Sequence, residues 1–282
     1  MRPPAVAGLF YDADPVSLEK TVRQCLSPEP QETLSENEWS AVLLPHAGHV
    51  YSGRIAGAAI ARLSWPSTVL LIGPNHRGTG ARVALSPASA WRTPLGDVPA
   101  ALELRDELLA ASDAIQEDSR AHAEEHSLEV IVPFLQVVSP GSRALFLSIA
   151  EPDLPLCLSV GRAVAKAVAS AASRGERVAL VVSSDLNHYL PREANRKKDD
   201  RAVDALLRGD PEELFDRILV EERISMCGVL PATAALEALR RLPPTVPEVV
   251  AHGDSGDASG ETGRVVGYAS IIWKTEKAKE GS

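Results

Sequence analysis

Residues 179–191, ALVVSSDLNHYLP, begin as an apolar strand and end in ionisable side chains. Ala179–Val182 are apolar without alternation, which is typical of a strand that is buried on both faces. Asp185 and His188 follow directly after this strand. In parallel α/β sheets, ligands bind beyond the carboxyl ends of the strands. The stretch therefore predicts a rigid strand that presents an acid and an imidazole at the edge of a sheet.

Two earlier segments have the same form. SAVLLPHAGHVYSG (40–53) and STVLLIGPNHRG (67–78) each contain a short apolar strand, a break at proline and a loop with a histidine, His46 or His76. Strand-like and helix-like segments alternate through most of the chain, which favours a mostly parallel sheet with helices on both faces. We therefore expect one α/β domain over residues 1–282, built as three αβα layers.

Other segments carry more local expectations. Asp14 followed by Pro15 is typical of a helix start, because the carboxylate caps the helix and proline fits its first position; this helix should reach about Leu26. We further expect a surface loop at 27–38, a helix at 53–63, a turn-rich connection at 90–99, a helix kinked by Pro133 at 127–138, a mobile glycine-rich loop at 253–263 that rims the pocket, and a frayed tail at 275–282.

Composition restricts the class of protein. The net charge is −9, and no run of Lys and Arg is interleaved with aromatic residues, which argues against nucleic acid as a partner. The first residues lack the apolar core of a signal peptide, and no apolar run reaches the roughly 18 residues of a membrane span. The 3 cysteines do not suggest a disulfide framework. We expect a cytoplasmic protein with reduced thiols and no membrane contact.

The strand-end histidines suggest a metal site. If their strands are parallel neighbours, His46, His76 and His188 converge on one crevice. Cys227, in SMCGVLPATAAL, lies where a helix should begin, a position that lowers the pKa of a thiol. Two imidazoles and a thiolate, from His46, His76 and Cys227, leave positions open for water or substrate. This donor mixture suits Fe, Cu or Zn and argues against Mg and Ca.

Other polar residues have assisting roles in this interpretation. Asp185 is suited to ligate the metal or to orient an imidazole, and His188 is left as a general acid or base. Glu125 and His126, in EEHSLE, lie at the start of another helix and add to the pocket. Each of these residues alone also has an ordinary structural explanation as a cap, a turn or a core residue. His49, His122 and His252 have no comparable setting, and we expect structural or surface roles for them.

Two other interpretations remain open. Cys227 and His188 have the residue types of a thiol nucleophile and its base, as in a cysteine-dependent hydrolase. The same pocket would also serve as a non-catalytic site for a peptide or a phosphate group. A serine triad is disfavoured, because Ser183, Ser184, Asp185 and His188 are too close along the chain and no GxSxG motif is present.

Eight ordered blocks resemble one known family over essentially the whole chain. They are RPPAVAGLFY, PHAGHVYSG, IGPNHRG, WRTPLGDVP, EEHSLEVIVPFLQ, SSDLNHYLP, CGVLPATAAL and VVGYASIIW. In this order they resemble the Memo family, whose bacterial members are called AmmeMemoRadiSam system protein B. That family is similar in fold to the catalytic subunits of class III extradiol dioxygenases, which are non-haem iron enzymes.

The resemblance implies roles for particular residues. His46 and His76 match metal ligands of the family, and Cys227 stands where the dioxygenases have a glutamate ligand. Asp185 and His188 match residues that line the pocket, and His188 matches the dioxygenase acid/base histidine. His49 stands where other members carry tyrosine, which places a polar group near the pocket. Asn75, next to His76, is counted in the same pocket.

The resemblance also implies cofactors and partners. The expected metal is Fe(II) or Cu, with Zn as an alternative, and the expected activity is that of an oxidoreductase on a small molecule. Replacing a carboxylate by a thiolate adds a soft, oxidisable ligand, which changes what the metal binds. The bacterial name implies a functional link to radical-SAM and AMME-type proteins. The eukaryotic relative is linked to receptor signalling and phosphopeptide binding.

Overall fold

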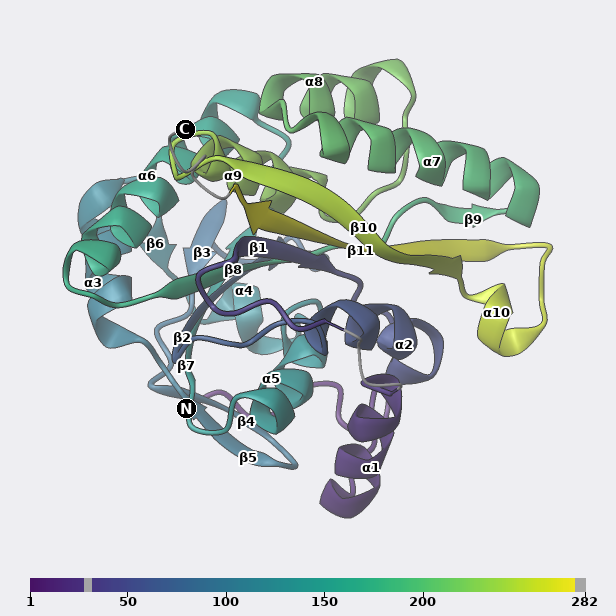
Figure 1. The fold of residues 1–282 in the computed structure, drawn as a ribbon, viewed down its shortest axis with the longest axis horizontal. Coiled ribbons are helices and arrows are strands. Elements are labelled where there is room, and N and C mark those ends of the chain that lie inside the picture. The colour runs from purple at the N-terminus through teal and green to yellow at the C-terminus, as the bar shows by residue number, and fades with distance from the viewer. Residues whose placement is uncertain (28–31, 277–282) are drawn as a thin grey trace, which may run out of the picture.

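The computed structural model describes residues 1–27 and 32–276, and its centre is a twisted sheet (Figure 1). Four parallel strands form the middle of this sheet. In spatial order they are β1 (Trp39–Leu44), β8 (Val178–Ser183), β2 (Thr68–Pro74) and β7 (Arg143–Ile149). The expected parallel sheet is confirmed for this central part.

Antiparallel strands extend the sheet on both sides. Next to β1 lies β11 (Val265–Thr275), which pairs with β10 (Thr245–Asp254) and with the short β9 (His188–Leu190). Next to β7 lies β3 (Val83–Leu85), followed by β6 (Gln116–Glu117). The segment 90–99, expected as a turn-rich connection, is a separate hairpin of β4 (Ala90–Thr93) and β5 (Gly96–Pro99).

Helices cover both faces of the sheet, as predicted (Figure 1). One face packs against α1 (Pro15–Cys25), α2 (His49–Ile60) and α5 (Val132–Val138). The other packs against α3 (Leu102–Ala111), α6 (Leu154–Ser173), α7 (Arg192–Arg208), α8 (Pro211–Asp216) and α9 (Val229–Leu239). Two short helices, α4 (Arg120–Ala123) and α10 (Gly256–Ser259), and the single turns Glu129–Ile131 and Arg217–Glu221 complete the described elements.

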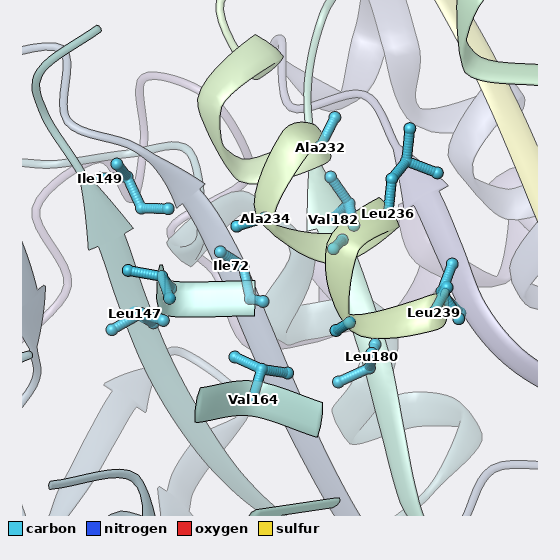
Figure 2. Close-up of a cluster of buried hydrophobic side chains, with 14 of the residues drawn as sticks. Ile72, Leu147, Ile149, Val164, Leu180, Val182, Ala232, Ala234, Leu236 and Leu239 are labelled. Atoms are coloured by element: carbon cyan, nitrogen blue, oxygen red, sulfur yellow. The ribbon is translucent and has the colours of Figure 1, made fainter. Parts of the chain in front are cut away.

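Burial on both faces explains the unbroken apolar run that begins β8. Leu180 and Val182 pack in the core beneath α6 and α9, whereas Ala179 and Val181 pack in the core beneath α1, α2 and α5. Figure 2 shows the first of these cores, with Leu180 and Val182 grouped with Val164 of α6 and Leu236 of α9. Since successive strand residues point to opposite faces, a strand covered on both sides needs apolar residues at every position.

Two helices begin where the local sequence favours a helix start. The Asp14 carboxylate accepts a hydrogen bond from the Ser17 amide at 2.8 Å, and α1 begins at Pro15 and ends at Cys25, close to the prediction. Pro133, expected to kink a helix, lies instead in the first turn of α5. A proline in the first turn loses no intrahelical hydrogen bond, so it starts this helix rather than bending it.

Other boundaries differ from the sequence-based expectation. Helix α2 begins at His49 rather than at residue 53, because the His49 amide is already fixed by the Phe10 carbonyl at 2.8 Å. The glycine-rich segment 253–263 holds the end of β10 and all of α10. Of the expected frayed tail 275–282, Thr275 ends β11 and the Glu276 amide donates to the Pro244 carbonyl oxygen at 2.9 Å, so these two residues are not frayed. Residues 277–282 of this tail and residues 28–31 of the expected surface loop lie outside the described residues.

Among the described residues, one helix has the length and mean hydropathy of a membrane span. It is α6, Leu154–Ser173, and half of that stretch is buried inside the protein. Its buried side chains, which include Val160 and Val164, belong to the core shared with α9. The apolar composition of α6 is therefore explained by its packing in the core.

Close packing of α6 on α9 gives a test of the fold. A Cβ atom at Gly161 would lie 2.4 Å from the Ala234 carbonyl oxygen and 2.6 Å from Glu237 Cβ. Replacing glycine by alanine stabilises an open helix by about 1 kcal/mol, but here we expect Gly161→Ala to lower the free energy of unfolding by about 1–3 kcal/mol, because α9 must move. Urea denaturation measures the change. Gly263→Ala, where no atom lies within 4 Å, is the control, and equal stability of the two variants would contradict this packing.

Candidate metal site

The loops that follow β1, β8 and β2 meet at one edge of the sheet. These three strands are parallel neighbours, so their carboxyl ends lie together, as the sequence predicted. The loops border a cavity of about 840 Å³. Six of the predicted site residues line it: His46, His76, His126, Asp185, His188 and Cys227.

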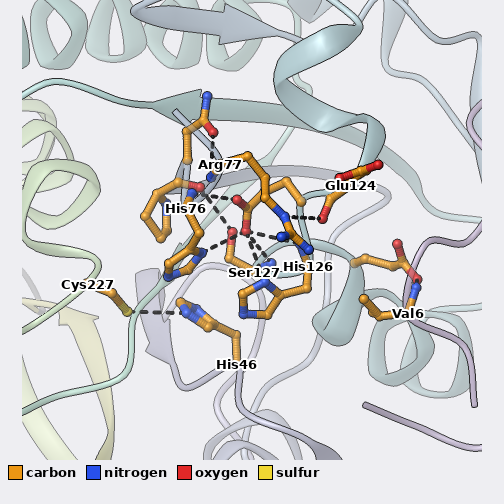
Figure 3. Close-up of polar contacts among 12 residues, drawn as sticks. Val6, His46, His76, Arg77, Glu124, His126, Ser127 and Cys227 are labelled. Carbon is orange, nitrogen blue, oxygen red and sulfur yellow. Dashed lines mark hydrogen bonds and ion pairs between the residues drawn. The ribbon is translucent and has the colours of Figure 1, made fainter. Parts of the chain in front are cut away.

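Three imidazoles that line this cavity lie close together (Figure 3). His46, His76 and His126 each offer a ring nitrogen, and these nitrogens all lie within 4.8 Å of one another. Cys227 Sγ lies 3.2 Å from His46 Nε2. His126 was expected to line the pocket; the structure brings it as close to the other two imidazoles as they are to each other. Its position after Glu125 gave no indication of this, because it follows no strand.

The tautomer of His46 is fixed by a chain of hydrogen bonds. The Ser183 hydroxyl donates to the Ser127 carbonyl oxygen at 2.7 Å, so its oxygen is left to accept from His46 Nδ1 at 2.6 Å. The proton of the neutral ring is therefore on Nδ1. The lone pair of Nε2 then points toward Cys227 and is available to a metal ion.

His76 is held in the same tautomer by a carboxylate. Glu125 Oε1 accepts from His76 Nδ1 at 2.8 Å, and Oε2 accepts from the His76 backbone amide at 2.6 Å. Glu125 is fully buried. Its burial raises the carboxyl pKa, but the contacts with His76 and the Ser127 amide outweigh burial and lower the pKa to about 2. Glu125 is therefore an ionised residue that orients His76 from behind the cavity.

A second buried carboxylate anchors this region to the N-terminus. Arg2 Nη1 lies 2.6 Å from Glu129 Oε2, and both side chains are buried. Arg2 also donates to the carbonyl oxygens of His122 and Glu125 at 2.6 and 2.7 Å. Arg2 thereby holds the segment that carries Glu125 and His126. This pair is not visible in the sequence, because no local pattern relates residues 127 positions apart.

Asp185 holds the His46 loop in place. Its Oδ1 accepts from the backbone amides of His46 and Ala47 at 2.8 and 3.3 Å. Burial raises the pKa of Asp185 to about 7, although these two hydrogen bonds oppose the shift. The carboxyl group therefore exchanges a proton near neutral pH.

Cys227 differs from the expectation based on its place before a helix. It precedes Gly228, the N-cap of α9, yet the pKa of its thiol is raised. Burial is the main cause, and the nearby Asp185 carboxyl adds to it. Loss of hydration thus outweighs the helix start. Without a cation beside it, the sulfur is a thiol.

His188 lines the same cavity and is held through one ring nitrogen. Its Nδ1 lies 2.9 Å from the Ser225 carbonyl oxygen, and because a carbonyl only accepts, Nδ1 carries the proton. Burial lowers the pKa of His188, so the ring is neutral at pH 7 with Nε2 unprotonated. This arrangement suits a residue that accepts a proton.

Three expected pocket residues lie outside the lining of this cavity: Glu125, the partner of His76, and also His49 and Asn75. His49 Nε2 lies 2.9 Å from the Val130 carbonyl oxygen, and its ring packs against Phe134 and borders a neighbouring hollow. Asn75 accepts from the Gly78 amide at 2.9 Å and donates to the Thr79 carbonyl at 2.8 Å. Asn75 therefore shapes the loop that carries His76, as asparagine commonly does in turns.

Comparison with known proteins identifies the family. The family model described as Memo-like protein matches residues 2–272. A MEMO1 family protein from Methanococcoides burtonii is 41% identical over 275 residues, which cover 97% of this chain and 100% of the relative. One from Aquifex aeolicus is 36% identical over 274 residues, covering 97% and 99%.

A solved structure shares the fold at low sequence identity. The crystal structure of uncharacterized protein JW3007 from Escherichia coli K12 is similar with a TM-score of 0.59 and 17% identity, over 83% of this chain and 99% of that one. The family match over nearly the whole chain agrees with the resemblance carried by the eight sequence blocks. The chain belongs to the Memo family.

Proposed function

We propose that this Memo-family protein holds one transition-metal ion through His46, His76 and Cys227, beside His126. The observation that carries the proposal is the grouping of three imidazole nitrogens within 4.8 Å, with a cysteine sulfur 3.2 Å from one of them. Imidazole and thiolate donors suit Fe(II), Cu or Zn.

The distances fit such an ion after a small contraction. Metal–nitrogen bonds of about 2.0–2.1 Å and metal–sulfur bonds of about 2.3 Å place the donors of a tetrahedral site roughly 3.3–3.6 Å apart. The sulfur and His46 Nε2 are already at 3.2 Å. The imidazoles, whose nitrogens spread up to 4.8 Å, need to approach by roughly 1 Å. The tautomers set by Ser183 and Glu125 leave both Nε2 lone pairs available.

The electrostatics of Cys227 also favour a metal. Burial and Asp185 raise the thiol pKa, and no Lys or Arg side chain contacts the sulfur within the described residues. A bound cation would supply the missing positive charge and convert the thiol into a thiolate ligand. The same facts weigh against a cysteine-dependent hydrolase, whose nucleophile requires a lowered pKa.

The proposed activity is a redox reaction of a small molecule in the cavity. When bound, Fe or Cu would supply a redox-active centre and a Lewis acid. The residues of the chain would do the remaining work: His188 Nε2 accepts a proton, and Asp185 holds or releases one near pH 7. Reduced thiols suit the reducing cytoplasm, which is the proposed location.

Metal content tests the ligand set. Protein purified without oxygen or chelator should contain one equivalent of metal, and His46→Ala and Cys227→Ala should each reduce retention by about tenfold or more, because one of three ligands is lost. Inductively coupled plasma mass spectrometry measures the content. His252→Ala, at a histidine that does not line the cavity, is the matched control. Unchanged metal in both ligand variants would refute the site and leave a non-catalytic binding pocket as the better explanation.

The lowered pKa of Glu125 predicts an acid-dependent stability. Its pKa of about 2 in the folded protein is below the ordinary glutamate value of 4.5, so its stabilising contribution is present above about pH 4.5 and is lost as pH falls toward 2. In metal-free protein, Glu125→Gln should flatten this part of the stability curve, by up to about 3 kcal/mol. Denaturant titrations between pH 2 and 6 measure it. Glu124→Gln, an exposed neighbour, should keep the wild-type slope; an unchanged slope in Glu125→Gln would show that Glu125 is not ionised in the fold.

Alkylation separates a metal ligand from a nucleophile. In metal-free protein at neutral pH, we expect Cys227 to react with iodoacetamide about tenfold or more slower than free cysteine, because burial keeps the sulfur protonated. Peptide mass spectrometry follows the reaction. Alkylation faster than that of free cysteine would instead support the hydrolase interpretation.

A further inference from the structure

Tyr189 has an unusual position next to His188. Its φ angle is +66°, a left-handed conformation that is unfavourable for an L-residue other than glycine. His188 pairs with Val266 and Leu190 pairs with Val265, so Tyr189 is the extra residue of a β-bulge. Successive strand residues normally point to opposite faces, but both His188 and Tyr189 line the cavity. The bulge thus turns Tyr189 toward the site.

Arg264 stands against the ring of Tyr189. Its Cζ lies 5.2 Å from the ring centroid, within cation–π distance. Arg264 is exposed and lines the same cavity. Within the described part of the chain, its guanidinium has no hydrogen bond and no carboxylate partner. This contrasts with Arg82, Arg92 and most other arginines, which are paired.

Arg264 is the one lysine or arginine among the described residues that line the cavity. The lining also has one carboxyl group, Asp185, whose Oδ1 accepts hydrogen bonds from the backbone amides of His46 and Ala47. Arg264 is therefore the side chain of this lining that is placed to bind an anionic group.

Aromatic rings dominate the apolar lining. The chain has only 4 tyrosines, and three of them, Tyr51, Tyr189 and Tyr268, line this cavity together with Phe10. Aromatic faces and edges contact flat, unsaturated groups favourably. The planar fork of Arg264 can bind both oxygens of a carboxylate.

We propose that Tyr189 and Arg264 form a recognition wall that selects a small carboxylate monoanion with a flat, apolar body. This proposal names the class of substrate that the cavity binds. It rests on the proposed function, which places the reaction at the metal site of the same cavity. Tyr189 contacts the flat body, and Arg264 binds the carboxylate away from the metal ligands. Neither residue is a metal ligand in this proposal.

Isothermal titration calorimetry with three probes tests the wall. The probes are benzoate, its neutral analogue benzamide, and phenyl phosphate, each titrated into metal-loaded and chelator-treated protein. Wild type should bind benzoate about tenfold or more tighter than benzamide, and also tighter than phenyl phosphate. Arg264→Gln should remove the preference for benzoate over benzamide, and Arg264→Lys should retain part of it. Lys166→Gln, on the exposed face of α6, is the matched loss of charge and should bind as wild type.

Tyr189→Gly separates recognition from structure. Glycine adopts positive φ without strain, so this variant should be at least as stable as wild type in urea yet bind benzoate several-fold more weakly. Equal binding of benzoate and benzamide by wild type, no benzoate binding, or an unchanged preference in Arg264→Gln would overturn the wall. Tighter binding of phenyl phosphate would overturn the carboxylate assignment.

Metal analysis of the same samples keeps the two proposals apart. Arg264→Gln should retain wild-type metal content, so loss of benzoate preference with the metal intact supports the wall. If His46→Ala and Cys227→Ala keep their metal while benzoate binding still depends on Arg264, the metal site fails and the wall stands. If these variants lose metal and Arg264→Gln binds benzoate as wild type, the wall fails and the metal site stands.

Discussion

The parallel pairing of β1, β8 and β2 is the constraint on which the site depends. Parallel neighbours end at the same edge, so the loops that follow them must meet there. His46, Asp185 and His76 are far apart in the sequence and become neighbours only through this pairing. Because both faces of the strands are buried, their register is fixed by packing on each side. The positions of the cavity residues are therefore set by the packing of the core and not by the loops alone.

A layer of buried polar residues then fixes the protonation of the imidazoles that the strands bring together. Ser183 and Glu125 set the proton positions on His46 and His76, and Arg2 holds the segment that provides Glu125. Each link has a partner, which a buried polar network requires if it is to be stable. The layer gives two imidazoles with free lone pairs beside a thiol whose charged form needs a cation. This combination favours a metal site over a nucleophilic cysteine.

Much of this arrangement could be predicted from the sequence, and the limits have physical causes. Unbroken apolar runs followed by histidine loops predicted the parallel core and the meeting of His46, His76 and His188, because strand ends in such sheets are a general binding place. The role of Arg2 could not be predicted, since its partner Glu129 is contacted only after the N-terminus crosses the fold. The raised pKa of Cys227 was missed, because a helix start is visible in sequence but burial is not. The bulge at Tyr189 depends on the register of two strands that the sequence does not align.

X-ray absorption spectroscopy of the metal-loaded protein is the decisive measurement for the proposed ligand set, because it counts the donor atoms around the ion. We expect nitrogen scatterers at about 2.0–2.1 Å and one sulfur at about 2.3 Å. The sulfur contribution should disappear in Cys227→Ser. A shell of nitrogen and oxygen alone in the wild-type protein would rule out Cys227 as a ligand, because its thiol would then have no part in holding the metal.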